Sequence, residues 1–110
     1  MPTTPIKSVT EQTFPAIALQ ADRNVLIQFW APWCRPCRRV TPVVEELAAD
    51  HRDVLDVVKV NVDEEPALAA RHGISSIPAF TVYTSGTRRG TWTGAAPKPV
   101  LEQQLASCLR

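Results

Sequence analysis

The amino-acid sequence predicts an α/β protein in which a mixed β-sheet is flanked by helices, with element order βαβαβαββα. Apolar, β-favouring segments alternate with helical ones along the chain, and residues 25–30 have the nearly continuous apolar character of a strand covered on both faces. Turn residues then separate the last two strand segments, as in a hairpin. Because 110 residues is a usual domain size, we expect residues 1–110 to form a single domain, with a flexible tail at residues 1–5.

Composition and charge exclude several classes of protein. Hydrophobic residues make up 45% of the chain and charged residues 21%, close to the averages of globular proteins, so disorder and fibrous repeats are disfavoured. Twelve basic and eleven acidic residues leave a formal charge of +1, too small to attract nucleic acid or anionic membranes. The N-terminus lacks the apolar stretch of an export signal and no run is long enough to span a membrane, so we expect a cytoplasmic location.

The first elements are two strands separated by a helix. Residues 6–10 predict a short strand, and a helix capped by Thr13 should follow it and end near Asp22. Residues 25–30 predict a strand at the centre of the sheet, in which Gln28 is the only polar residue.

The second half of the chain continues the alternation. Residues 54–62 predict a Val-rich strand, followed by an alanine-rich helix that Gly73 ends. Residues 79–84 and 90–93 predict a hairpin, and Pro99 should start the last helix. Before these elements, an amphipathic helix is indicated by apolar residues with helical spacing: Val40, Val44, Leu47 and Ala48.

Ten prolines are about twice the usual share, and two of them need a special place. Pro42 lies inside the amphipathic helix and should bend it. Pro78 follows Ile77 directly before a strand, a position suited to a tight turn with a cis peptide bond.

The candidate reactive residues are Cys34 and Cys37, which stand where the central strand ends and the amphipathic helix begins. Cysteines three apart on a helix lie on nearly the same face, so they can close a disulfide. Cys37 extends the apolar stripe and should be buried, whereas Cys34 lies at the helix edge beside free N–H groups, which lower a thiol pKa from about 8.5 towards about 7. We therefore expect Cys34 to be an exposed nucleophile and Cys37 to resolve the mixed disulfide, with no cofactor.

Other interpretations of this cysteine pair have less support from the sequence. Zinc would need further ligands from Cys108, His51 and His72, without the second close pair that marks zinc sites, so no metal is expected. Covalent haem needs histidine after the second cysteine, where Arg38 stands. Two inert core cysteines would not account for the strand-to-helix placement. Cys108 is interpreted as a buried thiol, with a regulatory role as the alternative, and neither histidine is assigned a catalytic role.

Residues 33–37 read Trp-Cys-Arg-Pro-Cys, and this motif resembles the active site of the thioredoxin family, usually Trp-Cys-Gly-Pro-Cys. Pro42 matches the proline that kinks the family's active-site helix, residues 77–78 match its cis-proline turn, and residues 94–95 match the glycine segment that lines the cysteines. The resemblance covers nearly the whole chain. It implies the thioredoxin fold, a central mixed sheet with helices on both faces.

The resemblance also implies a function. A monomer would reduce disulfides in partner proteins through a dithiol-disulfide cycle of Cys34 and Cys37, as an electron carrier recharged by an NADPH-dependent thioredoxin reductase. Two alternatives stay open: a binding or holdase module, and a more oxidising thiol oxidoreductase with weak reductase activity. The implied substrate groove consists of Trp33, Ile77, Pro78, Thr93, Gly94 and Ala95.

Two interior positions depart from the family pattern. Gln28 stands where the family usually has a buried aspartate that helps take the proton from the resolving cysteine, which an amide cannot do. We expect this change to slow resolution. Lys59 matches the lysine that usually pairs with that acid, and a solvated lysine at a strand edge is the simpler interpretation.

The motif itself also differs. Arg35 replaces the glycine before Pro36, and Arg38 and Arg39 follow closely. Their positive charge should favour a thiolate at Cys34 and stabilise the reduced pair. We therefore expect a more oxidising pair than in a Gly-Pro member of the family.

Overall fold

The computed structural model describes residues 5–109, which contain a five-stranded sheet of order β1-β3-β2-β4-β5. Strand β2 pairs in parallel with β3 and antiparallel with β4, so the sheet is mixed, as predicted. Residues 1–4 of the expected tail lie outside the described residues. The strands are β1 (Lys7–Ser8), β2 (Asn24–Trp30), β3 (Leu55–Asn61), β4 (Ala79–Thr84) and β5 (Thr87–Thr93).

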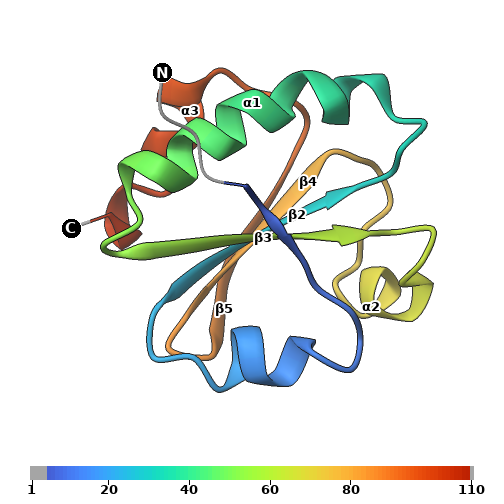
Figure 1. Ribbon diagram of the computed structural model, residues 1–110, viewed down its shortest axis with the longest axis horizontal. Helices are drawn as coiled ribbons and strands as arrows, with labels where there is room; N and C mark the ends of the chain where they lie inside the picture. The colour runs from blue at the N-terminus through green and yellow to red at the C-terminus, as the bar shows by residue number, and fades with distance from the viewer. Residues whose placement is uncertain (1–4, 110) are drawn as a thin grey trace.

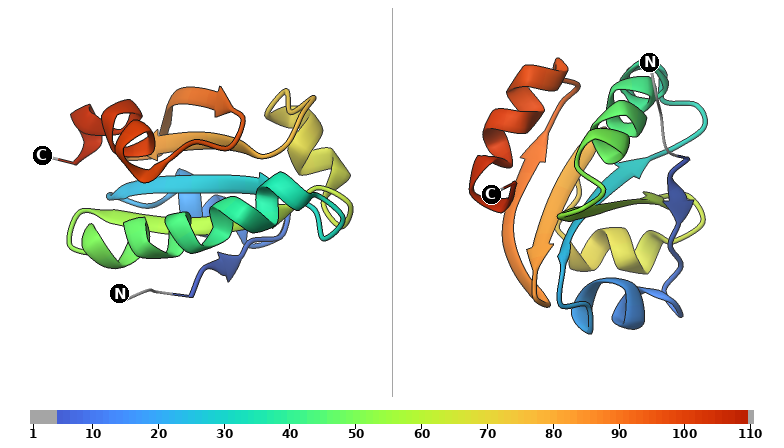
Figure 2. Two further views of the ribbon diagram at one scale, coloured as in Figure 1. Left: turned by 90° about the horizontal axis from the view of Figure 1, so that it is seen from above. Right: turned by 60° about the vertical axis from the view of Figure 1, so that its left-hand side comes forward.

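Helices cover both faces of this sheet (Figure 1). Helices α1 (Arg35–Asp50) and α3 (Lys98–Gln104) lie on one face, and a 3₁₀ turn, η2 (Ala106–Cys108), follows α3. The single π-type turn η1 (Pro15–Leu19) and helix α2 (Pro66–Arg71) lie on the other. Figure 2 shows the same two layers from other directions. The predicted α/β architecture is confirmed.

Strand β2 is central because it pairs with β3 on one edge and with β4 on the other, and both of its faces are buried. Val25, Ile27 and Phe29 have no exposed surface and pack on the η1 and α2 side. Leu26, 1% exposed, packs on the opposite side against residues of α1 and α3. The predicted central position is therefore confirmed.

The N-terminal elements are shorter than predicted. Strand β1 has two residues instead of five, and η1 ends at Leu19 rather than near Asp22. Thr13 does not cap the helix, because its Oγ1 accepts a hydrogen bond from the Thr10 N–H at 2.9 Å. This local turn takes the oxygen that a cap would need.

The hairpin of β4 and β5 is longer than predicted, since β5 begins at Thr87 and not at residue 90. Ser85 and Gly86 have φ values of 48° and 81°, the positive range that a tight two-residue hairpin turn requires. Strand pairing therefore starts directly after the turn, at Thr84 and Thr87.

The remaining helix ends follow familiar rules. Gly73, with φ of 67°, ends α2: its N–H donates to Ala70 O, and the N–H of Ile74 donates to Ala69 O. Helix α3 begins at Lys98, one residue before the predicted start, since Pro99 then stands in the first turn, where no N–H is needed.

Candidate redox-active site

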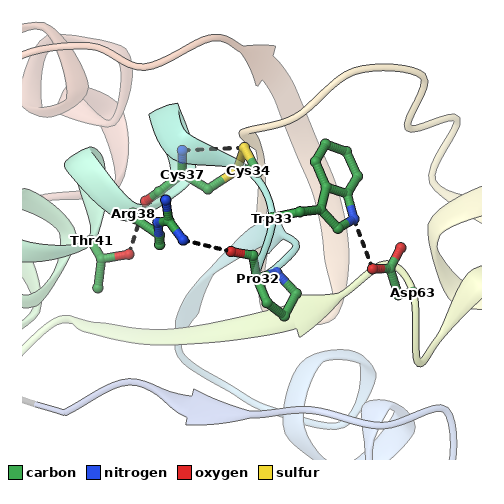
Figure 3. Close-up of a disulfide and its surroundings, with 7 residues drawn as sticks. All are labelled: Pro32, Trp33, Cys34, Cys37, Arg38, Thr41 and Asp63. Atoms are coloured by element: carbon green, nitrogen blue, oxygen red, sulfur yellow. Dashed lines mark hydrogen bonds between the residues drawn. A yellow bond between two sulfur atoms is a disulfide. The ribbon is translucent and has the colours of Figure 1, made fainter.

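Cys34 and Cys37 form a disulfide at the start of α1, directly beyond the end of β2 (Figure 3). Their Cα atoms are 5.3 Å apart, within the usual range for a disulfide. The disulfide predicted from the spacing of the two cysteines is therefore confirmed.

Cys34 is the N-terminal cap of α1. Its backbone is extended, with φ of −83° and ψ of 103°, and its Sγ accepts a hydrogen bond from the Cys37 N–H at 3.2 Å. Pro36 occupies the first helical turn, where its missing N–H costs nothing. The positive end of the helix dipole and this N–H both favour negative charge on the Cys34 sulfur.

Both cysteines are buried, so the expectation of an exposed Cys34 is wrong for the disulfide form. Cys37 has no exposed surface, and Cys34 is 4% exposed. The two pack with buried Ala31, and partly buried Trp30 and Ile77 cover this cluster. These contacts come from the end of β2 and from the cis-proline turn. The apolar periodicity of α1, from which the exposure of Cys34 was predicted, carries no information about them. Of the two sulfur-bearing residues, only Cys34 retains a small opening to solvent.

Trp33 lies at the surface, since 67% of it is exposed, and it is not part of the core. Its indole N–H donates to Asp63 Oδ2 at 2.8 Å, which orients the ring toward the segment after β3 (Figure 3). Beside the ring is a hollow of about 330 Å³. Besides Trp33 and Ile77, it is lined by four residues that sequence reasoning missed: Val62, Ile74, Ser75 and Ser76.

The predicted cis turn is present, because the Ile77–Pro78 peptide bond is cis. The N–H of Gly94 donates to Pro78 O at 2.8 Å, which joins this turn to the end of β5. Of the predicted groove residues in this region, Pro78 is buried, whereas Thr93, Gly94 and the adjacent Ala95 are exposed.

Gln28 and Lys59 are neighbours in the register of β2 and β3, but no hydrogen bond joins their side chains. Gln28 is 1% exposed, and its Nε2 has no partner among the described residues. The Nζ of Lys59 lies 4.8 Å from the ring centroid of Trp30, within cation–π distance. Lys59 therefore packs on an aromatic face and is not a fully solvated lysine at a strand edge.

Three arginines stand in the first two turns of α1. The guanidinium of Arg38 donates to Pro32 O at 3.1 Å, which ties the helix to the preceding loop. Arg35 and Arg39 are exposed, and within residues 5–109 neither forms a salt bridge. The first two turns of α1, which follow the cap residue Cys34, thus carry three positive charges.

The other titratable residues singled out from the sequence lie away from the disulfide. Cys108 is 8% exposed and packs in the core, which confirms a buried thiol. His51 caps the C-terminus of α1, with its Nε2 2.8 Å from Glu102 Oε2. Within the described part of the chain, no three potential ligands cluster as a metal site would require, and no helix has the length and apolar character to cross a membrane.

His72 caps the C-terminus of α2 and is 5% exposed. Its Nδ1 lies 2.8 Å from Leu68 O and its Nε2 2.8 Å from the Tyr83 hydroxyl. Burial, which removes the imidazole from water, lowers the pKa of His72. A neutral ring satisfies both contacts, with Nδ1–H donating to the carbonyl and Nε2 accepting from the tyrosine.

A helix-capping cysteine pair, placed after the central strand of a mixed sheet and close to a cis-proline turn, defines a class of thiol-disulfide oxidoreductases. The Thioredoxin family pattern matches residues 5–107, and the chain belongs to this family. It is 47% identical over 98 residues to thioredoxin 1 of Synechococcus elongatus, covering 89% of this chain and 92% of that protein.

Two further relatives agree with this assignment. The chain is 44% identical over 100 residues to the thioredoxin of Porphyra purpurea, covering 91% of this chain and 94% of that protein. It is 43% identical over 96 residues to the thioredoxin of Streptomyces clavuligerus, covering 87% and 89%. The chain has the thioredoxin fold, and it is a protein disulfide oxidoreductase that carries electrons on the redox pair Cys34 and Cys37.

Proposed function

We propose that, when this protein reduces a disulfide of another protein, Cys34 is the attacking thiolate and Cys37 the resolving thiol. The observation that carries the assignment is their unequal access to solvent, 4% against none. A partner sulfur can approach only the cysteine with an open side. The cap position of Cys34 adds the stabilisation of a thiolate by the helix N-terminus.

The reaction has two exchange steps. The Cys34 thiolate attacks one sulfur of the partner disulfide, a new S–S bond forms between the proteins, and the other partner sulfur leaves as a thiolate. Cys37 then loses its proton and attacks the Sγ of Cys34, which releases the second partner sulfur. Two electrons pass to the partner, and the pair ends as the disulfide.

The partner segment carrying the disulfide would lie across the predicted groove. Support comes from exposed Trp33 and from the hollow beside it, which offers apolar contact to varied side chains. The backbone of Ile77 would pair with an extended segment of the partner. The other proposed groove residues are Pro78, Thr93, Gly94 and Ala95.

Substitution of each cysteine tests the two roles. In a Cys108→Ser background, which removes the third thiol, Cys37→Ser should accumulate a mixed disulfide at Cys34 with oxidised insulin, detectable by mass spectrometry. Cys34→Ser should form none. Equal trapping by both variants, or trapping only at Cys37, would contradict the assignment.

Electrons for repeated turnover would come from an NADPH-dependent thioredoxin reductase, and the protein would act as a cytoplasmic monomer. This follows from its membership of the family and holds as a proposal. NADPH oxidation coupled to insulin reduction, with bacterial thioredoxin reductase added, is the measurement. No NADPH oxidation, while dithiothreitol still supports insulin reduction by the protein, would reject the reductase but leave the cysteine roles intact.

The Trp-Cys-Arg-Pro-Cys motif would distinguish this protein from members with glycine before the proline. We propose that Arg35, with Arg38 and Arg39 nearby, makes the pair more oxidising. The exposed positions of these arginines around the cap of α1 support the proposal.

A further inference from the structure

Arg35 and Arg39 form an unbalanced pair of positive charges beside the disulfide. They are four residues apart, so they lie on the same side of α1 and repel each other. Farther along α1, Glu46 and Asp50 are acidic residues, but both bind Lys98, whose Nζ is 2.9 Å from Glu46 Oε1. The Lys98 ammonium holds the pKa of Asp50 below its usual value, so this acid stays ionised and paired. Neither carboxylate compensates the two arginines.

A shallow hollow of about 240 Å³ adjoins Arg39. Its walls are apolar, with Val40 and Val43 from α1 facing the segment that joins β5 to α3. That segment contributes Ala95, Ala96 and Pro97. An apolar hollow with an unpaired guanidinium at its edge fits a polypeptide segment that places an apolar side chain next to a carboxylate.

The opposite side of the disulfide carries the opposite charge. Asp63 binds the Trp33 indole there, and Glu64 is exposed beside it. Figure 3 shows Trp33 and Asp63 on one side of the disulfide and Arg38 of α1 on the other. The hollow beside Trp33 and the hollow beside Arg39 share no lining residue, so a partner segment that crosses Cys34 meets the acidic groups and the arginines at different places.

We propose that an arginine face, defined as Arg35, Arg39 and the hollow beside Arg39, docks an acidic segment of the disulfide-bearing partner. This inference rests on the proposed function and names its substrate class: proteins whose reactive cysteine has Asp or Glu nearby. Arg39 is five residues beyond Cys34, about 7.5 Å along the helix. An extended partner covers that distance in about two or three residues, so the carboxylate should lie about two or three residues from the reactive cysteine.

Three synthetic disulfide peptides test the proposal. They are identical except for Glu, Gln or Lys at the position three residues from the attacked cysteine. The pre-reduced protein is mixed with each peptide, and the second-order rate constant is followed by tryptophan fluorescence. At low salt we expect the Glu peptide to react about three- to tenfold faster than the Lys peptide, since exposed ion pairs contribute modestly. Added salt should shrink this ratio.

Variants show whether the arginines cause the preference. Arg35→Gln combined with Arg39→Gln should bring the Glu-to-Lys ratio close to one, and Arg39→Glu should bring it below the wild-type value. Arg89→Gln is the matched control, because Arg89 is exposed on β5 and five residues from Gly94, about 16 Å along the strand. It should keep the preference.

The ratio separates docking from changes at the thiolate. A shift in the Cys34 pKa changes the rates of all three peptides alike and leaves their ratio unchanged. A wild-type ratio of one, a preference for Lys, or the same ratio in the double Gln variant would overturn the proposal. Failure of the proposed function looks different, since the neutral Gln peptide would then not be reduced at all.

Discussion

The Sγ of Cys34 accepts a hydrogen bond from the backbone N–H of Cys37 at 3.2 Å, so the two redox partners also form the N-terminal cap of α1. In the reduced protein this N–H would face a thiolate, and hydrogen bonds to charged acceptors are stronger than neutral ones. The backbone of the resolving residue therefore stabilises charge on the attacking one. Nearby groups that add or remove charge should tune the redox potential.

Replacing Arg35 should make the pair more reducing. Arg35→Gly removes a positive charge next to Cys34. The Cys34 thiolate becomes less stable, and so does the reduced form of the pair. We expect the redox potential to fall by about 10–20 mV, as judged from the modest energies of exposed charges. Equilibration with glutathione measures it. Arg35→Gln, which removes the charge without adding glycine, should give the same direction, and an unchanged potential in both variants would contradict the prediction.

Gln28 should limit the resolving step. It is 1% exposed and cannot accept the proton of Cys37 as a carboxylate can. Gln28→Asp should speed insulin disulfide reduction near neutral pH by about 10- to 100-fold, at or below the lower end of what a general base contributes. Gln28→Asn, of the same length as Asp but without the acid, should not. A rate for Gln28→Asp equal to that of the wild type would reject the idea.

Two glycines with positive φ should respond differently to alanine. At Gly86, with φ of 81°, an added Cβ would collide with the backbone oxygen of Leu19, whereas at Gly73, with φ of 67°, it would meet open space. We expect Gly73→Ala to lower the free energy of unfolding by about 1–2 kcal/mol and Gly86→Ala by about 1–3 kcal/mol more. Urea denaturation measures both, and equal losses would contradict the prediction.

The same denaturation curves test the expectation of a single domain. We expect one cooperative transition, in which the unfolding curves measured by fluorescence and by circular dichroism coincide. Two separate transitions would show that the chain contains more than one cooperative unit.

Acid should destabilise the protein through His72. Burial holds its folded pKa below the ordinary 6.5, with Arg88 and Arg71 lowering it further, while the unfolded residue titrates near 6.5. Between these values the unfolded state binds more protons, so the free energy of unfolding falls as the pH drops below about 6.5, by at most about 1.4 kcal/mol per pH unit.

Two histidine variants test this pH dependence. His72→Phe cannot take up the proton and should show a flatter pH dependence between about pH 5 and 6.5, although it also loses the hydrogen bonds to Leu68 and Tyr83. His51→Gln should keep the slope that His72 causes. Urea unfolding at several pH values is the measurement, and an unchanged slope in His72→Phe would exclude His72 as its source.

Several features could be predicted because they depend on local pattern. The apolar run at residues 25–30 identified the central strand, and the spacing of Cys34 and Cys37 identified the disulfide. Pro78 before a strand marked the cis turn. In each case, neighbouring residues along the chain carry the signal.

Other features were wrong or missed because they depend on contacts between distant segments. The burial of Cys34 depends on Ile77, and the orientation of Trp33 depends on Asp63. The stacking of Lys59 on Trp30 joins two strands, and no periodicity within either strand predicts it.

The sequence by itself determined that this is an α/β protein with a reactive cysteine pair at the start of a helix, since periodicity and spacing are properties of short segments. Only the tertiary structure decided which groups surround that pair. It buried Cys34, and it bound Glu46 and Asp50 to Lys98 while leaving Arg35 and Arg39 unbalanced. The physical reason is that burial and ion pairing depend on contacts between side chains that are distant in the sequence. The fold as a whole determines which of these contacts form.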